Sequence, residues 1–307
     1  MQENRVVVIA GPTASGKSAL AVDIAEQING VVINADSMQV YKDMPIITAA
    51  PSAQDKARVP HKLFEIYDLQ FRGNVVDWLT RAAEEIRNTW KEGKMPVVVG
   101  GTGLYIDNLI NGTTPIPETP DKIRAHVQQL IDDGQLDFIV EELKKCDPKT
   151  AQKLNPNDVS RIKRAYEVYL HTKKPISVWH KEPLINYLPE AKYFVIKICP
   201  SVEELDQRAF DRFDEMVKAG AIDEVQKLFK LKLSPNLPSM KALGVPELMD
   251  YFKGRANVYV AVQNAKLHTR QYAKRQRTWF KNRLQADFVY PKCYKGYFPK
   301  EIIELLK

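Results

Sequence analysis

The chain has 307 residues, of which 44% are hydrophobic and 27% are charged, a composition typical of a globular protein with a substantial core. No apolar run approaches the roughly 20 residues that a membrane-spanning helix needs, and no apolar signal segment precedes the first strand. We therefore expect a cytoplasmic protein that does not associate with membranes. Cys146, Cys199 and Cys293 are isolated from one another, which fits a reducing compartment and excludes a paired-cysteine metal or redox motif.

Residues 11–18 read Gly-Pro-Thr-Ala-Ser-Gly-Lys-Ser and form the strongest motif in the chain. They follow a β-branched run at residues 6–9 and precede a helical pattern at residues 19–25, the context that a P-loop requires. Backbone amides and the new helix N-terminus would hold phosphate oxygens, while Lys17 reaches the outer phosphate and the Ser18 hydroxyl holds Mg²⁺. The expected diphosphate-binding residues are Gly11, Thr13, Ala14, Ser15, Gly16, Lys17 and Ser18, with Ser18 as the metal ligand.

Two further strands end in polar or glycine-rich segments. The strand predicted at residues 31–35 ends at Asp36, which should lie beside the P-loop because ligands bind at the carboxyl ends of strands in open α/β sheets. On position alone, a helix N-cap role fits Asp36 equally well. The strand at residues 96–99 runs into Gly-Gly-Thr-Gly, where a P-loop ATPase or GTPase usually has the aspartate that supports Mg²⁺. Thr102 offers a neutral hydroxyl there, so plain nucleotide hydrolysis is disfavoured.

The order of the remaining elements predicts the domain organisation. From residue 121 to about residue 172 the pattern is wholly helical, and a strand pattern returns only at residues 193–198. We therefore predict an α/β fold, a parallel sheet of the P-loop NTPase type with helices on both faces, plus a mostly helical insertion domain. The expected boundaries are residues 1–118 and 191–307 for the catalytic core and residues 119–190 for the insertion. Residues 42–75 read as an irregular surface segment.

Residues 266–283 carry seven Lys and Arg side chains and no acidic residue. A solvated helix usually mixes both signs, so this segment indicates a polyanionic partner. On a helix, five of its bases fall within about a quarter of the circumference. These five bases are Lys266, Arg270, Lys274, Arg277 and Lys281, and the aromatic residues Tyr272, Trp279 and Phe280 lie opposite them, where core packing is the better interpretation.

Several segments together support a resemblance that the P-loop alone could not. The most specific are Asp-Ser-Met-Gln at residues 36–39, Gly-Gly-Thr-Gly-Leu-Tyr at residues 100–105 and Thr-Arg-Gln-Tyr-Ala-Lys-Arg-Gln at residues 269–276. With these segments the chain resembles the tRNA dimethylallyltransferases, or tRNA isopentenyltransferases, along nearly its whole length. It departs from the common family pattern at Ile47, where glycine is usual, and at Ala50, where a basic residue is usual.

The resemblance implies transfer of a dimethylallyl group from dimethylallyl diphosphate to the exocyclic N6 amine of the adenosine at tRNA position 37. It implies Mg²⁺ as cofactor, the tRNA anticodon stem-loop as partner, and an insertion domain that contacts tRNA; we expect a monomer. Asp36 would be the general base, Thr102 would donate to the departing oxygen, and Lys17 would stabilise the diphosphate together with Arg212. The implied tRNA-binding residues are Asp36, Ser37, Met38, Gln39, Thr102, Arg124, Arg161, Arg164, Lys241, Arg270, Lys274 and Arg277.

Two other functions remain open at this stage. A P-loop small-molecule kinase, such as a nucleoside kinase, would share the fold and Lys17 but would bind ATP and act without RNA. An RNA-binding protein with a relict P-loop would not depend on Asp36. The glycine-rich segment around Thr102 and the basic segment favour the prenyltransferase over the kinase.

Overall fold

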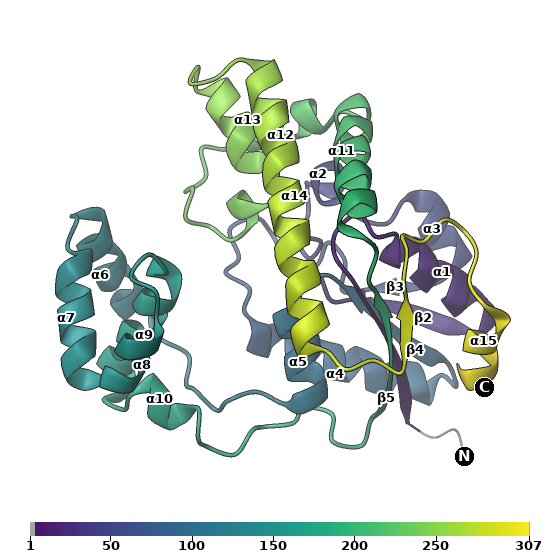
Figure 1. The fold of residues 1–307 in the computed structure, drawn as a ribbon, viewed down its shortest axis with the longest axis horizontal. Coiled ribbons are helices and arrows are strands. Elements are labelled where there is room, and N and C mark those ends of the chain that lie inside the picture. The colour runs from purple at the N-terminus through teal and green to yellow at the C-terminus, as the bar shows by residue number, and fades with distance from the viewer. Residues whose placement is uncertain (1–3, 307) are drawn as a thin grey trace. The chain divides into compact units, whose positions relative to one another are not determined.

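The computed structural model describes residues 4–306 and contains a six-stranded sheet in which all neighbouring strands are parallel (Figure 1). The strand order is β3-β2-β4-β1-β5-β6, so β2, β3 and β4 lie on one side of β1, and β5 and β6 lie on the other. The carboxyl end of β1 is therefore a topological switch point, where ligands bind in such sheets. The strands are β1 (Arg5–Ala10), β2 (Gly30–Asn34), β3 (His61–Lys62), β4 (Met95–Gly100), β5 (Lys192–Ile198) and β6 (Phe288–Tyr290).

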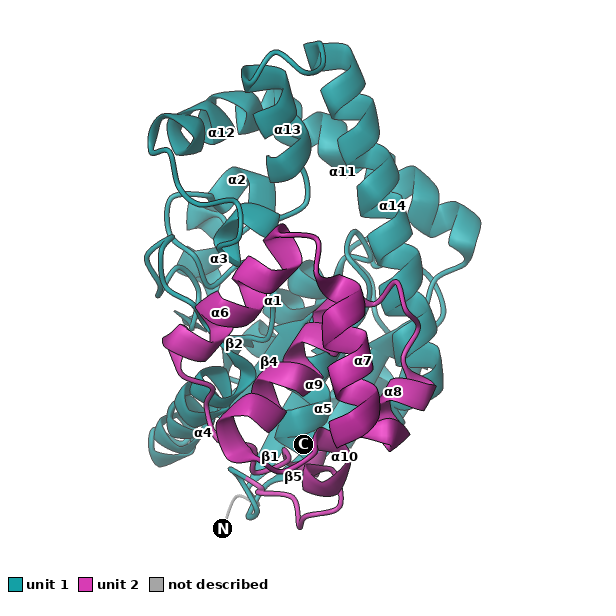
Figure 2. Ribbon diagram, turned by 90° about the vertical axis from the view of Figure 1, so that its left-hand side faces the viewer, with its two compact units in different colours: residues 1–110, 187–307 teal, residues 111–186 magenta. Residues whose placement is uncertain are grey.

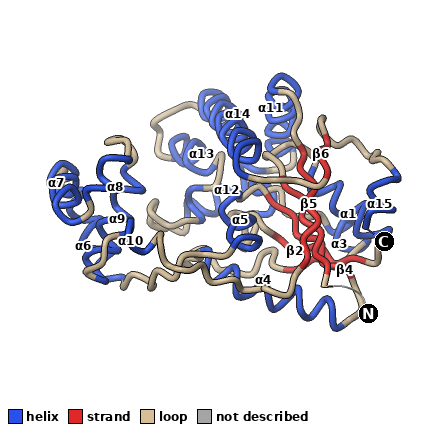
Figure 3. Tube along the Cα trace, turned by 60° about the horizontal axis from the view of Figure 1, so that its bottom comes forward, coloured by secondary structure: helices blue, strands red, loops and turns tan. Residues whose placement is uncertain are grey.

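Helices cover both faces of this sheet (Figure 3). One face packs against α4 (Val75–Lys91), α5 (Gly103–Asn111) and the C-terminal end of α14 (Val258–Arg283), and the other packs against α1 (Lys17–Gln27) and α15 (Lys300–Leu306). The sequence of β1 explains the two layers, because Val8 joins the apolar cluster of Trp78 whereas Ile9 joins that of Leu20. The predicted α/β fold with helices on both faces is confirmed.

A third apolar cluster lies beyond the sheet and includes buried residues from the segment 42–75. Met44, Ile47 and Tyr67 are among its buried members, so the expectation of a surface segment is wrong for this part of the chain. Prolines interrupt the segment, but the apolar residues between them anchor it. The cluster combines α2 (Pro45–Thr48), α11 (Val202–Lys218), α12 (Ala221–Lys230), the 3-10 helix η1 (Ser239–Lys241), α13 (Val245–Phe252) and the first half of α14; α3 (Ala53–Arg58) follows α2.

The chain divides into two compact units, residues 1–110 with 187–307 and residues 111–186 (Figure 2). The second unit is helical and has its own apolar core around Val127, Ile139 and Ile162. For comparison, the sequence predicts a helical insertion at residues 119–190. Its helices are α6 (Asp121–Asp132), α7 (Leu136–Cys146), α8 (Pro148–Lys153), α9 (Val159–Thr172) and α10 (Ile176–Trp179).

The longest helix is α14, with 26 residues. Its length would suffice to cross a bilayer, but its many basic residues make it far too polar to do so. Across residues 4–306, no helix combines the length and the apolar character that a membrane span requires.

Candidate active site

The P-loop, residues 11–18, joins β1 to α1 at the switch point of the sheet. Gly16 has a φ of 84°, and a Cβ atom there would lie 2.7 Å from the Tyr294 carbonyl oxygen, so glycine is required. The Ser15 side chain is fully buried, and its hydroxyl has no hydrogen-bond partner within the described residues.

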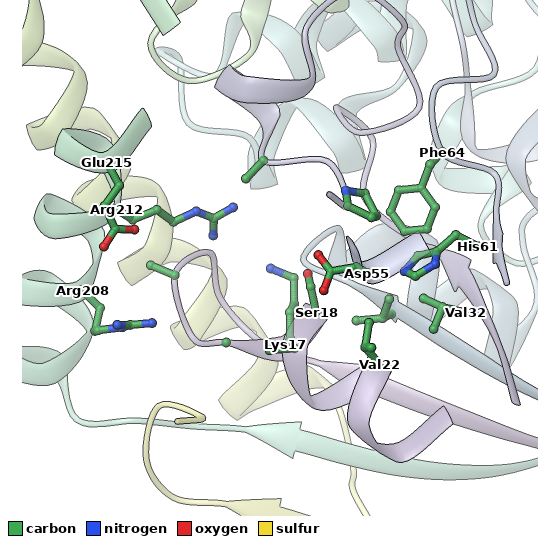
Figure 4. A pocket seen from close by; sticks show the side chains of 16 residues that line it. Lys17, Ser18, Val22, Val32, Asp55, His61, Phe64, Arg208, Arg212 and Glu215 are labelled. Carbon is green, nitrogen blue, oxygen red and sulfur yellow. The ribbon is translucent and has the colours of Figure 1, made fainter. Parts of the chain in front are cut away.

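A cavity of about 440 Å³ lies beside this loop, and we call it the P-loop cavity (Figure 4). Lys17 and Ser18 of α1 line it, and Arg208 and Arg212 extend toward the loop from α11. Three cationic side chains beside the N-terminus of α1 make this end of the cavity suited to a multiply charged anion. The other lining residues include the apolar Val22, Val32 and Phe64 together with Asp55, His61 and Glu215.

The charges around Lys17 act on its protonation. Burial lowers the pKa of the Lys17 ammonium to about 8, with Asp36 opposing this effect and Arg212 adding to it. Burial also lowers the pKa of Arg212, which still remains charged at neutral pH. Lys17 is thus a cation near neutrality whose charge is poorly hydrated, and an anionic ligand would stabilise it.

A second cavity of about 340 Å³ is lined by Asp36, and we call it the Asp36 cavity. Arg212 lines both cavities, so its side chain lies between them. Burial raises the pKa of Tyr272, another lining residue, to about 12, so its phenol stays neutral and can donate a hydrogen bond. The remaining lining residues include Thr13, Ser37, Met38, Phe213, Met216, Lys241 and Arg275.

Hydrogen bonds fix Asp36 in the turn after β2. Its Oδ1 accepts from the Met38 amide at 2.9 Å, and its own amide donates to Asn34 Oδ1 at 2.8 Å. Thr102 Oγ1, at the end of β4, accepts from the Ser37 amide at 2.9 Å. These bonds hold the carboxylate of Asp36 and the hydroxyl of Thr102 in adjacent turns at one edge of the sheet.

The short helix α2 contributes to both cavities, with Ile47 and Thr48 in the Asp36 cavity and Ala49 in the P-loop cavity. Glu224 of α12 anchors this helix by accepting the Ile46 amide at 3.0 Å and the Ile47 amide at 2.8 Å. Gln39 anchors its other end, since its amide group donates to the carbonyl oxygens of Thr48 and Ala49. Gln39 is therefore buried against α2.

The basic face of α14 is partly neutralised. Lys266 pairs with Asp214 at 2.6 Å and Arg270 pairs with Asp206 at 2.7 Å, both acids being on α11. Arg277 Nε donates to the Pro200 carbonyl oxygen at 2.8 Å. Lys274, Arg275 and Arg283 have exposed side chains and lie on a strip of the helix around Trp279. This strip consists of Gln271, Lys274, Arg275, Thr278, Trp279, Asn282 and Arg283, and we call it the outer strip of α14.

Arg124, Arg161 and Arg164 belong to the helical unit. Arg124 pairs with Glu118 at 3.1 Å, and Arg164 Nη1 donates to the Thr119 hydroxyl at 2.8 Å. Burial lowers the pKa of Arg164. Arg161 is the most exposed of the three arginines, with 76% of its side chain accessible.

The structure thus brings together the P-loop, Asp36, Ser37, Met38, Thr102, Arg212 and Lys241. Sequence reasoning missed Tyr272, Arg275 and Gln276 at this site. Their spacing on α14 with the buried Thr269 was the available signal, because residues three or four apart share a helix face. It missed Glu224 as well, for which no local pattern exists.

Comparison with known proteins places this site in context. The sequence matches the model of the family described as IPP transferase over residues 39–283 and that of isopentenyl transferase over residues 4–60. A tRNA dimethylallyltransferase from Bradyrhizobium sp. (strain ORS 278) is 40% identical over 297 residues, which is 96% of this chain and 96% of that protein.

Solved structures are similar over comparable lengths. The full-length tRNA isopentenylpyrophosphate transferase from Bacillus halodurans has a TM-score of 0.69 and 32% identity, covering 98% of this chain and 94% of that one. The crystal structure of a eukaryotic dimethylallyltransferase acting on tRNA has a TM-score of 0.75 and 32% identity, covering 90% of this chain and 69% of that one.

Proposed function

The chain belongs to the IPP transferase family, and we propose that it transfers a dimethylallyl group from dimethylallyl diphosphate to the N6 amine of the adenosine at tRNA position 37. The observation that carries this proposal is the pair of cavities that share Arg212, one beside the P-loop and one lined by Asp36. A donor diphosphate in the first and an acceptor base in the second would meet at that guanidinium.

The P-loop cavity is the proposed diphosphate site. Displacement at an allylic carbon develops negative charge on the leaving diphosphate, so fixed donors there lower the barrier. The P-loop amides, Lys17 and Arg212 would supply these donors. Each such donor is typically worth about 3–4 kcal/mol of transition-state stabilisation.

The Asp36 cavity is the proposed adenosine site. The amine of adenine is a weak nucleophile, and Asp36 would take its proton as the new bond to carbon forms. The Thr102 hydroxyl would donate to the bridging oxygen of the departing diphosphate. The base must leave its stack to reach these groups, which costs a few kcal/mol and is least costly in a loop.

Mg²⁺ fits the P-loop cavity if the diphosphate and water supply most of its ligands. No three His, Cys, Asp or Glu side chains in residues 4–306 are grouped so that they could hold a metal by themselves. The Ser18 hydroxyl would hold the ion together with diphosphate oxygens and water, a donor set that Mg²⁺ commonly accepts. When bound there, it supplies neutralisation of the charge on the leaving diphosphate.

The proposed RNA partner is the anticodon stem-loop, bound by a monomer in the cytoplasm. On α14 we assign the contacts with phosphate to Lys274 and its neighbours on the outer strip, because these bases have exposed side chains whereas Arg270 is paired with Asp206. Arg161 is the favoured contact of the helical unit, because 76% of its side chain is exposed even though it pairs with Asp158 at 3.4 Å.

The experiment that tests this function is incubation of the enzyme with labelled dimethylallyl diphosphate, Mg²⁺ and tRNA that carries adenosine at position 37. Label should transfer to that tRNA and not to one with guanosine at the same position. A kinase would instead transfer phosphate from ATP without RNA. Absence of label in tRNA, with a working control enzyme in the same conditions, would refute the proposal.

A further inference from the structure

Gln276 connects two loops of the active site through its side-chain amide. It lies on the buried face of α14 and is 7% exposed. Its Oε1 accepts a hydrogen bond from the Thr13 amide of the P-loop at 2.8 Å, and its Nε2 donates to the Gly101 carbonyl oxygen at 2.7 Å. Only one orientation of the amide makes both bonds, because one needs an acceptor and the other a donor.

The backbone around Gly101 is adapted to this contact. A Cβ atom on Gly101 would come within 2.5 Å of the Gln276 Nε2, so any larger residue would displace the amide. Gly101 immediately precedes Thr102, and Thr13 lies in the loop that surrounds the diphosphate site. The amide therefore spans the gap between the proposed leaving-group donor and the proposed diphosphate cradle.

We infer that Gln276 is a positioning residue, which holds the P-loop and the Gly101–Thr102 segment in the relative geometry that the transfer step requires. The inference rests on the proposed function and adds to it a residue that does not touch either substrate. Loss of the bridge would leave the two substrates bound but would displace Thr102 relative to the diphosphate. Displacements of about 1 Å can reduce a chemical step about 100-fold.

Two substitutions separate this role from a merely structural one. Gln276→Met keeps the size of the side chain but removes both hydrogen bonds. Gln276→Glu keeps the acceptor for Thr13 but has no proton to donate to Gly101 while the carboxyl is ionised. A buried carboxyl without a cationic partner has a raised pKa, so acidic solution would protonate it and restore the bridge.

We expect Gln276→Met to lower kcat roughly 10- to 100-fold at every pH, with KM for both substrates changed less than about twofold. We expect the activity of Gln276→Glu, taken relative to wild type at each pH, to rise as the solution becomes more acidic. Gln263→Glu is the matched control, because it adds the same charge to α14 and leaves the bridge intact; its relative activity should stay constant with pH. The inference would be overturned by a normal kcat in Gln276→Met or by a loss of its activity through KM alone. It would also be overturned if the activity of Gln276→Glu relative to wild type did not change with pH.

A second variant and a second readout keep the test independent of one substitution. Gly101→Ala should displace the amide from the other side, and its effect should not add to that of Gln276→Met. Additive losses would contradict a shared bridge. Exchange of the Thr13 amide hydrogen should be faster in Gln276→Met, and this readout stays valid even if the wild-type enzyme alkylates no tRNA. An unchanged exchange rate would again overturn the inference, whereas failure of alkylation alone would refute only the proposed function.

Discussion

The Thr102 hydroxyl accepts a hydrogen bond from the Ser37 amide at 2.9 Å, which ties the end of β4 to the turn after β2. The same hydroxyl donates to Ser37 Oγ at 3.2 Å. Asp36 directly precedes Ser37, so the proposed base and the proposed leaving-group donor are held by one short network. Bound dimethylallyl diphosphate would instead accept the hydrogen bond that Thr102 now donates to Ser37.

Thr102→Val tests this hydroxyl, because valine keeps the shape of threonine and cannot donate. We expect kcat to fall about 100- to 1,000-fold, the usual effect of removing one donor to developing negative charge. Thr102→Ser is the control and should retain most of the activity. Steady-state kinetics with both substrates varied gives the answer, and a valine variant with wild-type kcat would exclude the role.

Asp36→Asn removes the base with little change to the turn, since an amide oxygen can still accept from Met38. We expect kcat to drop about 10²- to 10⁴-fold. Affinity for tRNA, measured by titration of labelled stem-loop, should remain unchanged. A parallel loss of tRNA affinity would instead indicate that Asp36 serves binding.

The lowered pKa of Lys17, about 8, predicts a pH effect on donor capture. Below pH 8 the ammonium is charged and attracts the diphosphate, and above it the neutral amine does not. The ratio kcat/KM for dimethylallyl diphosphate, which reports the free enzyme, should therefore decline as pH rises through about 8. Lys17→Arg should abolish this decline, because the guanidinium stays charged. A decline that persists in the arginine variant would have another origin.

Glu224→Gln tests the anchoring of α2. Burial raises the pKa of Glu224, while the amides of Ile46 and Ile47 bind its carboxylate. The amide variant can accept only one of these bonds, so we expect the free energy of unfolding to fall by about 1–3 kcal/mol. Urea denaturation measures this, with the exposed Asp223→Asn on the same helix as the control. Equal stabilities of the two variants would contradict the anchoring.

Salt dependence of tRNA binding distinguishes the exposed Lys274 from Arg270, which is paired with Asp206. Lys274→Ala should lower the slope of log K against log salt by about one, as expected for one lost phosphate contact. Arg270→Ala should change it less than half as much, because Arg270 already pairs with Asp206. The opposite order would contradict the assignment of a phosphate contact to Lys274.

Local sequence patterns sufficed for the P-loop and for four of the six strands, β1, β2, β4 and β5, whereas the short edge strands β3 and β6 gave no such signal. The β-branched runs of β1 and β4 and the glycine-rich turn after β1 are short-range signals, and the resemblance to tRNA dimethylallyltransferases, which rested on contiguous motifs, is confirmed by the family match over residues 39–283. Asp36 was open between an N-cap and a base; its Oδ1 bonds the Met38 amide within a turn and does not cap a helix.

Long-range pairing explains what the sequence did not reveal. The bases of α14 looked unpaired because their partners, Asp206 and Asp214, are on another helix. Gln276 gives no local signal of its role, because its two partners come from loops far away in the chain. Such contacts have no periodicity that a local pattern could show.

The most direct test of the account is nucleoside analysis of tRNA after reaction with unlabelled dimethylallyl diphosphate. With the wild-type enzyme, mass spectrometry should find the adenosine at position 37 carrying one dimethylallyl group on N6, and with Asp36→Asn that nucleoside should remain unmodified over the same time. Unmodified adenosine with the wild-type enzyme, or a dimethylallyl group attached elsewhere in the RNA, would contradict it.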